Sequence, residues 1–332
     1  MSMPAFPAVV VFEPGPAELT EVAEEDLPEE PVSVEVAFSS LNYKDALAVT
    51  GRGKVVRSFP MTCGIDLAGT VVESKDPALV PGDEVVVTGW GLGERHPGGF
   101  TTRQRIRPEW ALRPPAGLDL RRCMAVGTAG LTAMLCVMAL EEGGLRPAGE
   151  GGAEVLVTGA AGGVGSFAVA LLARLGHRVL ASTGRPELER ELRSLGAAEV
   201  LDRRALASGP ERPLLTERWA GAVDTVGSTT LASALSGTRY GGTVAACGLA
   251  GGSELPGSVL PFILRAVRLV GVDSVRCPAA LRATAWRRIA ELLSVDVLDA
   301  LHEVRPMSEV VQLAGALLSG TVHGRVVIDP RR

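Results

Sequence analysis

The sequence has few aromatic side chains and very few lysines. Phe, Trp and Tyr make up 4% of the 332 residues, and the two tyrosines are Tyr43 and Tyr240. Few aromatics together with 40 glycines disfavour an aromatic-rich β-sandwich and are typical of tight turns and of helices packed closely on sheets. Lysine occurs only as Lys44, Lys54 and Lys75, so arginine carries most of the positive charge.

Metal and disulfide motifs are also missing. The five cysteines are odd in number, widely spaced and form no C-x-x-C pair. The four histidines, His96, His177, His302 and His323, form no H-x-x-x-H or H-E pair. A zinc site needs convergent Cys, His and carboxylate ligands, and a small disulfide-stabilised fold needs paired cysteines. We therefore expect no metal and no disulfide framework. No G-x-S-x-G elbow supports a serine hydrolase either.

The charge and hydropathy patterns exclude two further classes of protein. The net charge of -5 argues against a nucleic-acid partner, which would favour a basic surface. By inspection, no run reaches the ~18–20 apolar residues that a membrane span needs. Residues 1–4 lack the basic-then-apolar layout of a signal peptide. We expect a cytoplasmic protein with no membrane segment.

Two regions of different character follow one another along the chain. Residues 1–120 hold short strand-like segments between Gly and Pro turns, which predict a small β-barrel. The expected strands there are Val32–Val36, Thr70–Val72 and Glu84–Val87. The tail is expected to form a helix and a strand that either close the sheet of the second region or return to the first. These two elements are Val310–Leu318 and Val326–Ile328.

The second region alternates strands and helices, which predicts right-handed βαβ crossovers and a parallel sheet. The expected strands are Val155–Thr158, Arg178–Thr183, Glu199–Leu201, Ala222–Val226, Thr243–Cys247 and Leu269–Val272. The expected helices are Leu131–Leu140, with Thr128 as N-cap, Val164–Leu175 and Pro186–Leu195. The segment 147–152 is expected to be a loop. At this length the chain is expected to form about two domains.

A glycine-rich turn gives the clearest functional signal, and it reads Val157-Thr158-Gly159-Ala160-Ala161-Gly162-Gly163-Val164-Gly165. An apolar strand is expected before it and an apolar helix after it. Small residues at Gly159, Gly162 and Gly165 allow a tight turn, close approach of the backbone to a pyrophosphate and close packing of helix on sheet. The helix N-terminus offers free N–H groups to phosphates. The motif predicts a dinucleotide site rather than an ordinary loop.

The end of the next strand indicates which dinucleotide is bound. An NAD site usually has Asp or Glu there for the ribose hydroxyls. Here the strand ends Thr183-Gly184-Arg185, with no acid. A guanidinium suits the 2′-phosphate of NADP through paired, charge-assisted hydrogen bonds. We therefore expect NADPH, with Arg203 after the third strand as a second clamp; the alternative is that both arginines are surface residues.

Together these residues resemble the medium-chain dehydrogenase/reductase superfamily, which joins a GroES-like β-barrel catalytic domain to a Rossmann coenzyme domain. In its zinc members a G-H-E motif carries a histidine and a glutamate of the metal site. The matching segment here is Cys63-Gly64-Ile65-Asp66-Leu67-Ala68-Gly69, so Ile65 replaces the histidine, and the lobe with four structural cysteines is missing. Both departures favour the zinc-free, quinone-oxidoreductase-like branch.

Further segments narrow the resemblance to the YhdH/YhfP type, over nearly the whole chain and in the same order. They are Ser39–Leu47, Gly89–Gly91, Gly127–Leu135, Ala246–Gly252, Pro261–Arg265 and Gly271–Val275. The resemblance implies an α/β fold with a catalytic domain of residues 1–120 completed by 296–332, and a doubly wound, NADP-binding domain of residues 121–295. It also implies a homodimer.

The resemblance implies a set of contacts with NADPH. They are Tyr43, Ala161, Gly162, Gly163, Val164, Thr183, Gly184, Arg185, Arg203, Leu249, Ile263 and Ser274. It further implies zinc-independent, NADPH-dependent reduction of the C=C bond of a short α,β-unsaturated acyl-CoA, acryloyl-CoA to propanoyl-CoA, with hydride delivered to the β-carbon. Two alternatives stay open: a reductase of quinones or other activated alkenes, and an NADPH-binding sensor or structural protein with little catalysis.

The candidate catalytic residues are Asn42, Tyr43 and Asp45, which lie in one short segment. Tyr43 could position the nicotinamide or donate a proton, directly or through water. Asn42 and Asp45 could orient nicotinamide, substrate or water, or they could simply hold the loop. Because coenzyme A carries phosphates, we also expect a cationic entrance. Its candidates are Arg52, Lys54 and Arg57, each of which could equally be a solvated surface residue.

Overall fold

A computed structural model describes residues 5–147 and 154–332. The expectations for the extreme N-terminus and for the loop 147–152 therefore lie mostly outside the described residues. The chain divides into two compact units, which we call the first and the second unit. The first unit comprises Met1–Thr128, Val275–Ala290 and Ser294–Arg332, and the second comprises Ala129–Ser274 and Glu291–Leu293. Of the residues expected in the coenzyme domain, 121–128, 275–290 and 294–295 thus group with the first unit.

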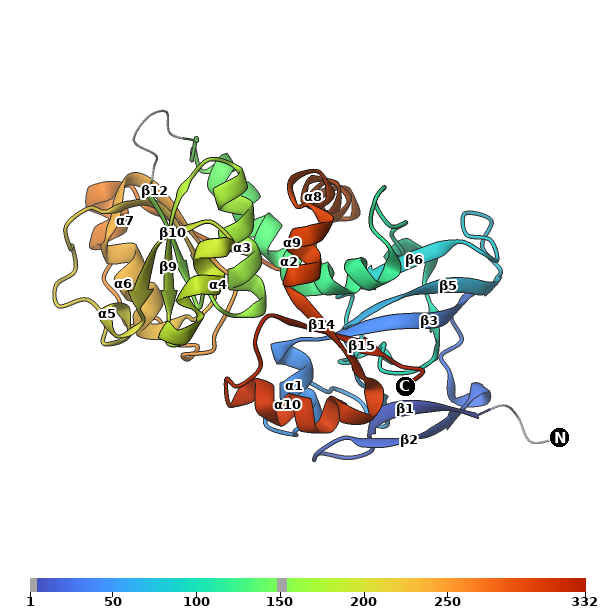
Figure 1. Ribbon diagram of the computed structural model, residues 1–332. Helices are drawn as coiled ribbons and strands as arrows, with labels where there is room; N and C mark the ends of the chain where they lie inside the picture. Colours follow the sequence, from blue (N-terminus) through green and yellow to red (C-terminus); the bar gives the residue numbers. More distant parts are fainter. Residues whose placement is uncertain (1–4, 148–153) are drawn as a thin grey trace. The chain divides into compact units, whose positions relative to one another are not determined.

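The first unit contains two sheets whose strands are mostly antiparallel (Figure 1). A three-stranded sheet has the order β2-β1-β4, with β1 Ala5–Val11, β2 Glu18–Ala23 and β4 Met61–Thr62. A six-stranded sheet has the order β14-β15-β3-β5-β6, and β7 also pairs with β3. Its strands are β3 Val32–Leu41, β5 Asp66–Ser74, β6 Glu84–Thr88, β7 Arg103–Ile106, β14 His302–Pro306 and β15 Arg325–Asp329. The three strands expected from the sequence of the first region are confirmed within β3, β5 and β6.

The C-terminal tail returns to the first unit. Strand β15 pairs antiparallel with the end of β3, with Val326 opposite Leu41 and Ile328 opposite Ser39. Helix α10, Val310–Leu318, packs on helix α1, Tyr43–Val49, around a shared apolar core. The remaining helical segments of this unit are α8 Ala279–Leu292, α9 Val295–Ala300 and the short 3-10 turns Glu24–Asp26, Pro108–Trp110 and Met307–Glu309. Of the two fates expected for the tail, the return to the first region is confirmed.

The second unit is a parallel six-stranded sheet in the order β10-β9-β8-β11-β12-β13. The strands are β8 Glu154–Thr158, β9 Arg178–Thr183, β10 Ala197–Asp202, β11 Trp219–Asp224, β12 Thr238–Ala246 and β13 Arg268–Gly271. Numbered within the unit, the order is 3-2-1-4-5-6, the doubly wound order of dinucleotide-binding sheets. Strand β9 has the expected bounds, whereas the last three expected strands begin and end some residues too late. A parallel strand buried on both faces reads as a continuous apolar run, which leaves its ends poorly marked.

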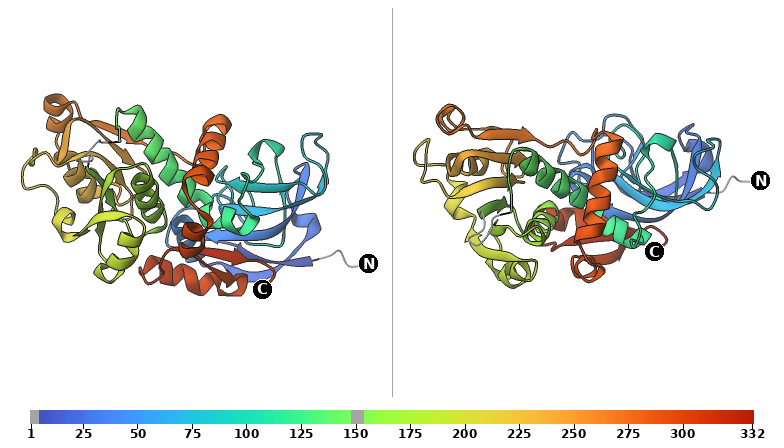
Figure 2. Two further views of the ribbon diagram at one scale, coloured as in Figure 1. Left: turned by 45° about the horizontal axis from the view of Figure 1, so that its top comes forward. Right: turned by 90° about the horizontal axis from the view of Figure 1, so that it is seen from above.

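Helices lie on both faces of this sheet (Figure 1, Figure 2). They are α3 Gly163–Arg174, α4 Glu189–Ser194, α5 Arg204–Ala207, α6 Ser228–Ser236, α7 Leu260–Arg265 and the 3-10 turn Pro186–Leu188. Leu231 and Leu235 of α6 pack against Leu156 and Leu180 of the central strands. The strand order runs one way from β8 to β10 and the other way from β11 to β13, so right-handed crossovers put α3 and α4 on one face and α6 and α7 on the other.

Helix α2, Leu120–Glu142, corrects two expectations. It begins eight residues before the expected N-cap Thr128, and it breaks at Gly127, where φ is 47° and ψ is −156°. With 23 residues and a mean hydropathy of 2.0 in its most apolar window, it is also long and apolar enough by composition to cross a membrane, which corrects the expectation that no apolar run reaches that length but not the expectation of no membrane segment. Because 83% of that window is buried in the protein, the helix is built like the core helix of a soluble protein.

Candidate functional site

The glycine turn follows β8 in the second unit, at the point where the strand order reverses. Gly159 has a φ of 58°, and an added Cβ there would lie 2.2 Å from Thr225 Oγ1. At Gly165, on the first turn of α3, a Cβ would lie 2.3 Å from the carbonyl oxygen of Gly159. Only glycine fits at both positions, so the turn brings the N-terminus of α3 directly against the strand end. Ligands of open α/β sheets bind at this switch point, and the helix N-terminus suits a pyrophosphate.

A buried aspartate ties the two central strands together beside the turn. Asp224, at the end of β11, accepts a hydrogen bond from Thr158 Oγ1 at 2.6 Å and one from the backbone N–H of Gly227 at 2.7 Å. Burial raises the pKa of Asp224. This carboxyl group is occupied within the protein, so we assign it to fixing the strand ends rather than to a ligand.

The cationic end of β9 lies at the same edge of the sheet. Arg185 donates from Nη2 to the carbonyl oxygen of Ala161 at 2.5 Å, and its backbone N–H bonds Thr183 Oγ1 at 3.1 Å. The side chain of Arg203 covers Gly184, since a Cβ on that glycine would lie 2.5 Å from Arg203 Cδ. Burial lowers the pKa of Arg185, as expected for a guanidinium held partly away from water. The structure therefore brings the two predicted arginines and the glycine turn together.

Three other residues implied as cofactor contacts have different surroundings. Leu249 and Ile263 are exposed on the second unit, at 62% and 68% of their surface. Ser274 is buried and its Oγ accepts a hydrogen bond from Thr132 Oγ1 at 2.8 Å. The role of these three residues as cofactor contacts therefore stays a prediction from the resemblance.

The candidate catalytic segment begins helix α1 in the first unit. Tyr43 is the first residue of the helix and is 45% exposed, whereas Asn42 and Asp45 are buried. Asp45 Oδ2 accepts the backbone N–H of Asn42 at 2.8 Å, one half of a capping box, and Asp45 Oδ1 accepts the N–H of Ile65 at 2.9 Å. The local sequence therefore folds so that the two polar neighbours face inward and the phenol faces outward.

Behind this helix start lies a group of polar side chains that we call the Asp66 cluster: the buried Ser40, Asn42, Asp45, Asp66 and Arg325, and the half-buried Thr128. Asp66 Oδ2 accepts from Ser40 Oγ at 2.6 Å, from Asn42 Nδ2 at 2.9 Å and from the backbone N–H of Thr128 at 2.9 Å. Its other oxygen accepts from Thr128 Oγ1 at 2.5 Å. The carboxylate thereby holds the chain on both sides, at the start of α1 and just after the break in α2.

The cluster carries two carboxyl groups and one guanidinium. Arg325 of β15 donates to Ser40 Oγ at 2.9 Å, Asn42 Oδ1 at 3.1 Å, and the carbonyl oxygens of Leu41 at 3.2 Å and Ala125 at 3.1 Å. Burial and the nearby Asp66 raise the pKa of Asp45 to about 7. Burial lowers the pKa of Arg325, against the attraction of the two carboxyl groups.

Two family profiles match the chain. The alcohol dehydrogenase GroES-like domain matches residues 28–114, and the family described as zinc-binding dehydrogenase matches residues 163–291. The chain is 52% identical to the probable acrylyl-CoA reductase AcuI of Escherichia coli over 306 residues, which is 92% of this chain and 93% of that protein. This chain belongs to the medium-chain dehydrogenase/reductase superfamily, in its YhdH/YhfP group.

Other members of the superfamily support this placement. The chain is 51% identical to acrylyl-CoA reductase AcuI of Ruegeria pomeroyi, covering 92% of this chain and 91% of that protein. It is 45% identical to the putative quinone oxidoreductase YhfP of Bacillus subtilis, with 92% of each covered. The yhdH oxidoreductase of Salmonella enterica, solved in complex with NADP, superposes with a TM-score of 0.93 at 48% identity, over 98% of this chain and 99% of that one. The expected α/β fold, GroES-like domain plus Rossmann sheet, is confirmed.

The residues at the zinc position of this superfamily do not fit a metal. Ile65 stands where a zinc member has histidine, and burial raises the pKa of the neighbouring Cys63 thiol well above its ordinary value. Asp66 is already engaged by Ser40, Asn42 and Thr128. Within residues 5–147 and 154–332, no three His, Cys, Asp or Glu side chains lie close enough to share an ion. We therefore derive no step through zinc.

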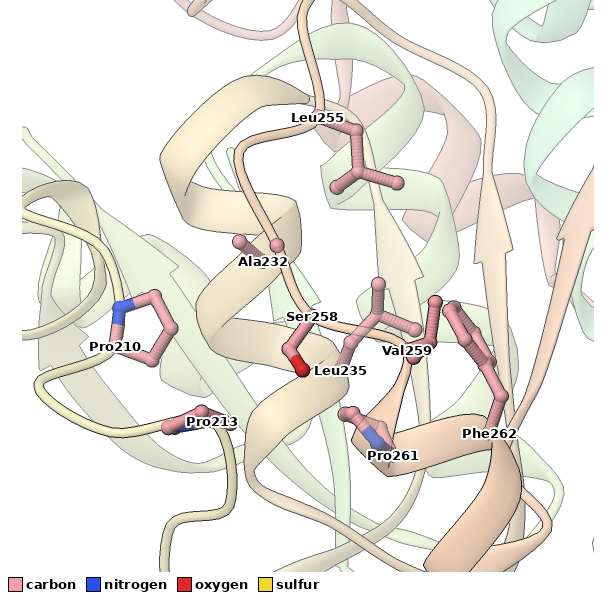
Figure 3. A pocket seen from close by; sticks show the side chains of 10 residues that line it. Pro210, Pro213, Ala232, Leu235, Leu255, Ser258, Val259, Pro261 and Phe262 are labelled. Atoms are coloured by element: carbon pink, nitrogen blue, oxygen red, sulfur yellow. The ribbon is translucent and has the colours of Figure 1, made fainter.

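An apolar cavity of about 220 Å³ lies elsewhere in the second unit (Figure 3). Leu255, Val259 and Phe262 line one side and face Pro210 and Pro213 across it (Figure 3). No predicted catalytic or cofactor residue lines this cavity. Its lining has no convergent polar groups, and we assign it no role in the reaction.

Sequence reasoning missed the members of the Asp66 cluster that are distant in the chain. Arg325 and Ser40 are 285 positions apart, and no spacing rule connects them. One weak signal was available, because Asp66 occupies the acidic position of the motif matched at Gly64-Ile65-Asp66. Thr128 was also singled out, but only as a helix N-cap and not as a partner of the Asp66 carboxylate.

Proposed function

We propose that this chain is an NADPH-dependent reductase of short α,β-unsaturated acyl-CoA thioesters, with acryloyl-CoA as its substrate and propanoyl-CoA as its product. One observation carries the proposal: the chain is 52% and 51% identical to two acrylyl-CoA reductases over nine-tenths of its length. Tyr43 is exposed at the start of a helix that buried polar groups hold in place, so its hydroxyl is available to a bound substrate.

The residues of the second unit fit the dinucleotide. The glycine turn and the N-terminus of α3 would hold the pyrophosphate, and Arg185 with Arg203 would hold the 2′-phosphate. The space at the turn supports this, because a side chain at Gly159 or Gly165 would collide with neighbouring atoms. NADPH, when bound, supplies the hydride for the β-carbon of the substrate. Leu249, Ile263 and Ser274 remain proposed contacts by resemblance.

The first unit would supply orientation and proton control. Reduction at the β-carbon places negative charge on the thioester oxygen and requires a proton at the α-carbon. Tyr43 is the exposed hydroxyl of the candidate segment and we propose that it orients the nicotinamide or passes a proton, directly or through water. Asn42 and Asp45 are hydrogen-bonded to each other, and Asn42 also to Asp66, so we propose that they act by holding Tyr43 in place.

The coenzyme A part of the substrate carries phosphates and would meet basic side chains. Arg52, Lys54 and Arg57 follow helix α1 closely and are all exposed. Exposed cations attract an anionic ligand over about one Debye length and raise its rate of encounter. We propose these three residues as the cationic entrance.

A quinone or another activated alkene is the second candidate acceptor. The observation that favours it is the 45% identity to the putative quinone oxidoreductase YhfP, over 92% of both chains. We further propose a homodimer, which an unpaired outer edge of β13 in the described sheet would permit, and a cytoplasmic location.

A screen of NADPH oxidation with acryloyl-CoA, crotonoyl-CoA and a quinone tests the proposal. We expect the highest kcat/KM with acryloyl-CoA and a lower value with crotonoyl-CoA. A clear preference for the quinone would overturn the acyl-CoA assignment. Tight NADPH binding without turnover of any of the three would instead support a sensor or structural protein.

A further inference from the structure

The Asp66 cluster fixes the orientation of one amide group. Asn42 Oδ1 accepts from Arg325, while Asn42 Nδ2 donates to Asp66 Oδ2 at 2.9 Å and to Asp45 Oδ2 at 3.1 Å. A guanidinium has only donors, and an ionised carboxylate has only acceptors. Turning the amide over would set donors against donors and acceptors against acceptors. The Arg325 guanidinium on one side and the Asp66 carboxylate on the other therefore select a single orientation of Asn42.

The Ser40 hydroxyl is oriented by the same two charged residues, Arg325 and Asp66. Its hydroxyl accepts from Arg325 Nη2 and donates to Asp66 Oδ2, so it links cation to anion in one direction only. Ser40 and Arg325 are both fully or nearly fully buried, at 0% and 3% exposure. In such surroundings an unpaired polar group is costly, which makes partial rearrangement of the cluster unfavourable.

Asn42 is also the residue that directly precedes Tyr43. Its backbone N–H and its side chain are both held, by Asp45 and by the Arg325–Asp66 pair. The direction in which the first turn of α1 presents the phenol thus depends on charges in β5 and β15. A small change of that direction matters, because misplacing a reacting group by about 1 Å can cost on the order of a hundredfold in rate.

We propose that Arg325 and Asp66 are positioning residues for Tyr43, acting through the oriented amide of Asn42. The expected effect on turnover rests on the proposed function, because that function assigns Tyr43 its role. The expected effect on the orientation of Tyr43 does not depend on it. Arg325→Lys would keep the positive charge but remove the planar guanidinium. A single ammonium group cannot reach the four acceptors to which Arg325 donates.

A kinetic double-mutant cycle between Arg325→Lys and Tyr43→Phe tests the coupling. We expect Arg325→Lys to lower kcat by about ten- to a hundredfold, with the Kd of NADPH unchanged within about twofold. In the Tyr43→Phe background the same change should cost less than about threefold, because both act through one hydroxyl. Equal losses in both backgrounds would overturn the inference.

A second double-mutant cycle pairs Ser40→Ala, a smaller change, with Tyr43→Phe. It tests the coupling if Arg325→Lys does not fold. We expect about a three- to tenfold loss of kcat with Tyr43 present and almost none in the Tyr43→Phe background. The matched control is Arg331→Lys, an exposed arginine just after β15, which should leave kcat unchanged.

A spectroscopic measurement separates this inference from the proposed function. The chain has only two tyrosines, so protein labelled with fluorotyrosine should give two 19F resonances, assigned through Tyr43→Phe. We expect Arg325→Lys and Ser40→Ala to shift the Tyr43 signal and to leave that of Tyr240. An unmoved Tyr43 signal would overturn the positioning role whatever acceptor the enzyme reduces. If no acceptor in the screen is reduced but the variants still shift the Tyr43 signal, the proposed function is overturned and the positioning role stands.

Discussion

Arg185 donates to the carbonyl oxygen of Ala161 and so joins the end of β9 to the glycine turn after β8. The hydrogen bond places a cation at the edge of the sheet where the two strands end together. Arg185 is half-buried, and this burial lowers the pKa of its guanidinium. A phosphate at this edge would meet a charge that is already oriented.

Arg185→Gln should lower the affinity for NADPH far more than the affinity for NADH. Glutamine stays polar but has no charge for a 2′-phosphate, and it is too short to replace the Nη2 that reaches Ala161. Hydrogen bonds to charged groups contribute about 1.5–3 kcal/mol, so we expect roughly a ten- to hundredfold loss of kcat/KM for NADPH. Arg178→Gln, at the opposite end of β9, is the matched control and should change neither value. An equal loss with NADH would assign Arg185 a purely structural role.

Gly165→Ala should destabilise the second unit and abolish dinucleotide binding. The added Cβ would lie 2.3 Å from the carbonyl oxygen of Gly159 and 2.7 Å from Ala160 Cα, so the backbone must shift. We expect the free energy of unfolding to fall by about 1–3 kcal/mol or more. Gly315→Ala in α10 is the control, because no heavy atom lies within 4 Å of its Cβ and alanine favours a helix. Thermal unfolding and NADPH fluorescence measure both effects.

Asp45 should make the stability of the protein depend on pH. Its folded pKa, about 7, lies above its ordinary value of 3.8. Between these values the folded chain binds a proton that the unfolded chain has lost, so the free energy of unfolding falls as pH rises through this window. The shift corresponds to on the order of 4 kcal/mol.

Asp45→Asn removes this titration. Urea unfolding at pH 5 and pH 8 should therefore show a smaller loss of stability in the variant than in the wild type. Asp26→Asn, at an exposed position, is the control and should retain the wild-type difference. A difference in Asp45→Asn as large as in the wild type would contradict the expectation.

Reversing the charges of Arg52, Lys54 and Arg57 should weaken the use of acyl-CoA selectively. With glutamate at all three positions, we expect the KM of acryloyl-CoA to rise about tenfold at low ionic strength and less at high ionic strength, because salt screens exposed charges. A small enone without coenzyme A should show no such rise. Lys75→Glu is the exposed control. If KM rises equally for the enone, the three residues act on something other than the coenzyme A phosphates.

Much of the second unit could be predicted because its signals are local. The strand, turn and helix around Gly159–Gly165 follow one another without interruption, and β9 begins and ends where the sequence predicts. The acid-free strand end at Arg185 is likewise visible from neighbouring residues. Hydrophobic period and turn chemistry act over a few residues, so they can be recognised in a single chain.

The sequence by itself thus determined a doubly wound sheet with a cradle for a dinucleotide, and a segment, Asn42 to Asp45, suited to catalysis. Only the tertiary structure decided which of those side chains face inward. It brought Asp66, Thr128 and Arg325 to the start of α1 from three distant elements and broke α2 at Gly127 beside them. The physical reason is that a buried charge must find its partners in space, and strand pairing such as that of β15 with β3 supplies them across hundreds of residues.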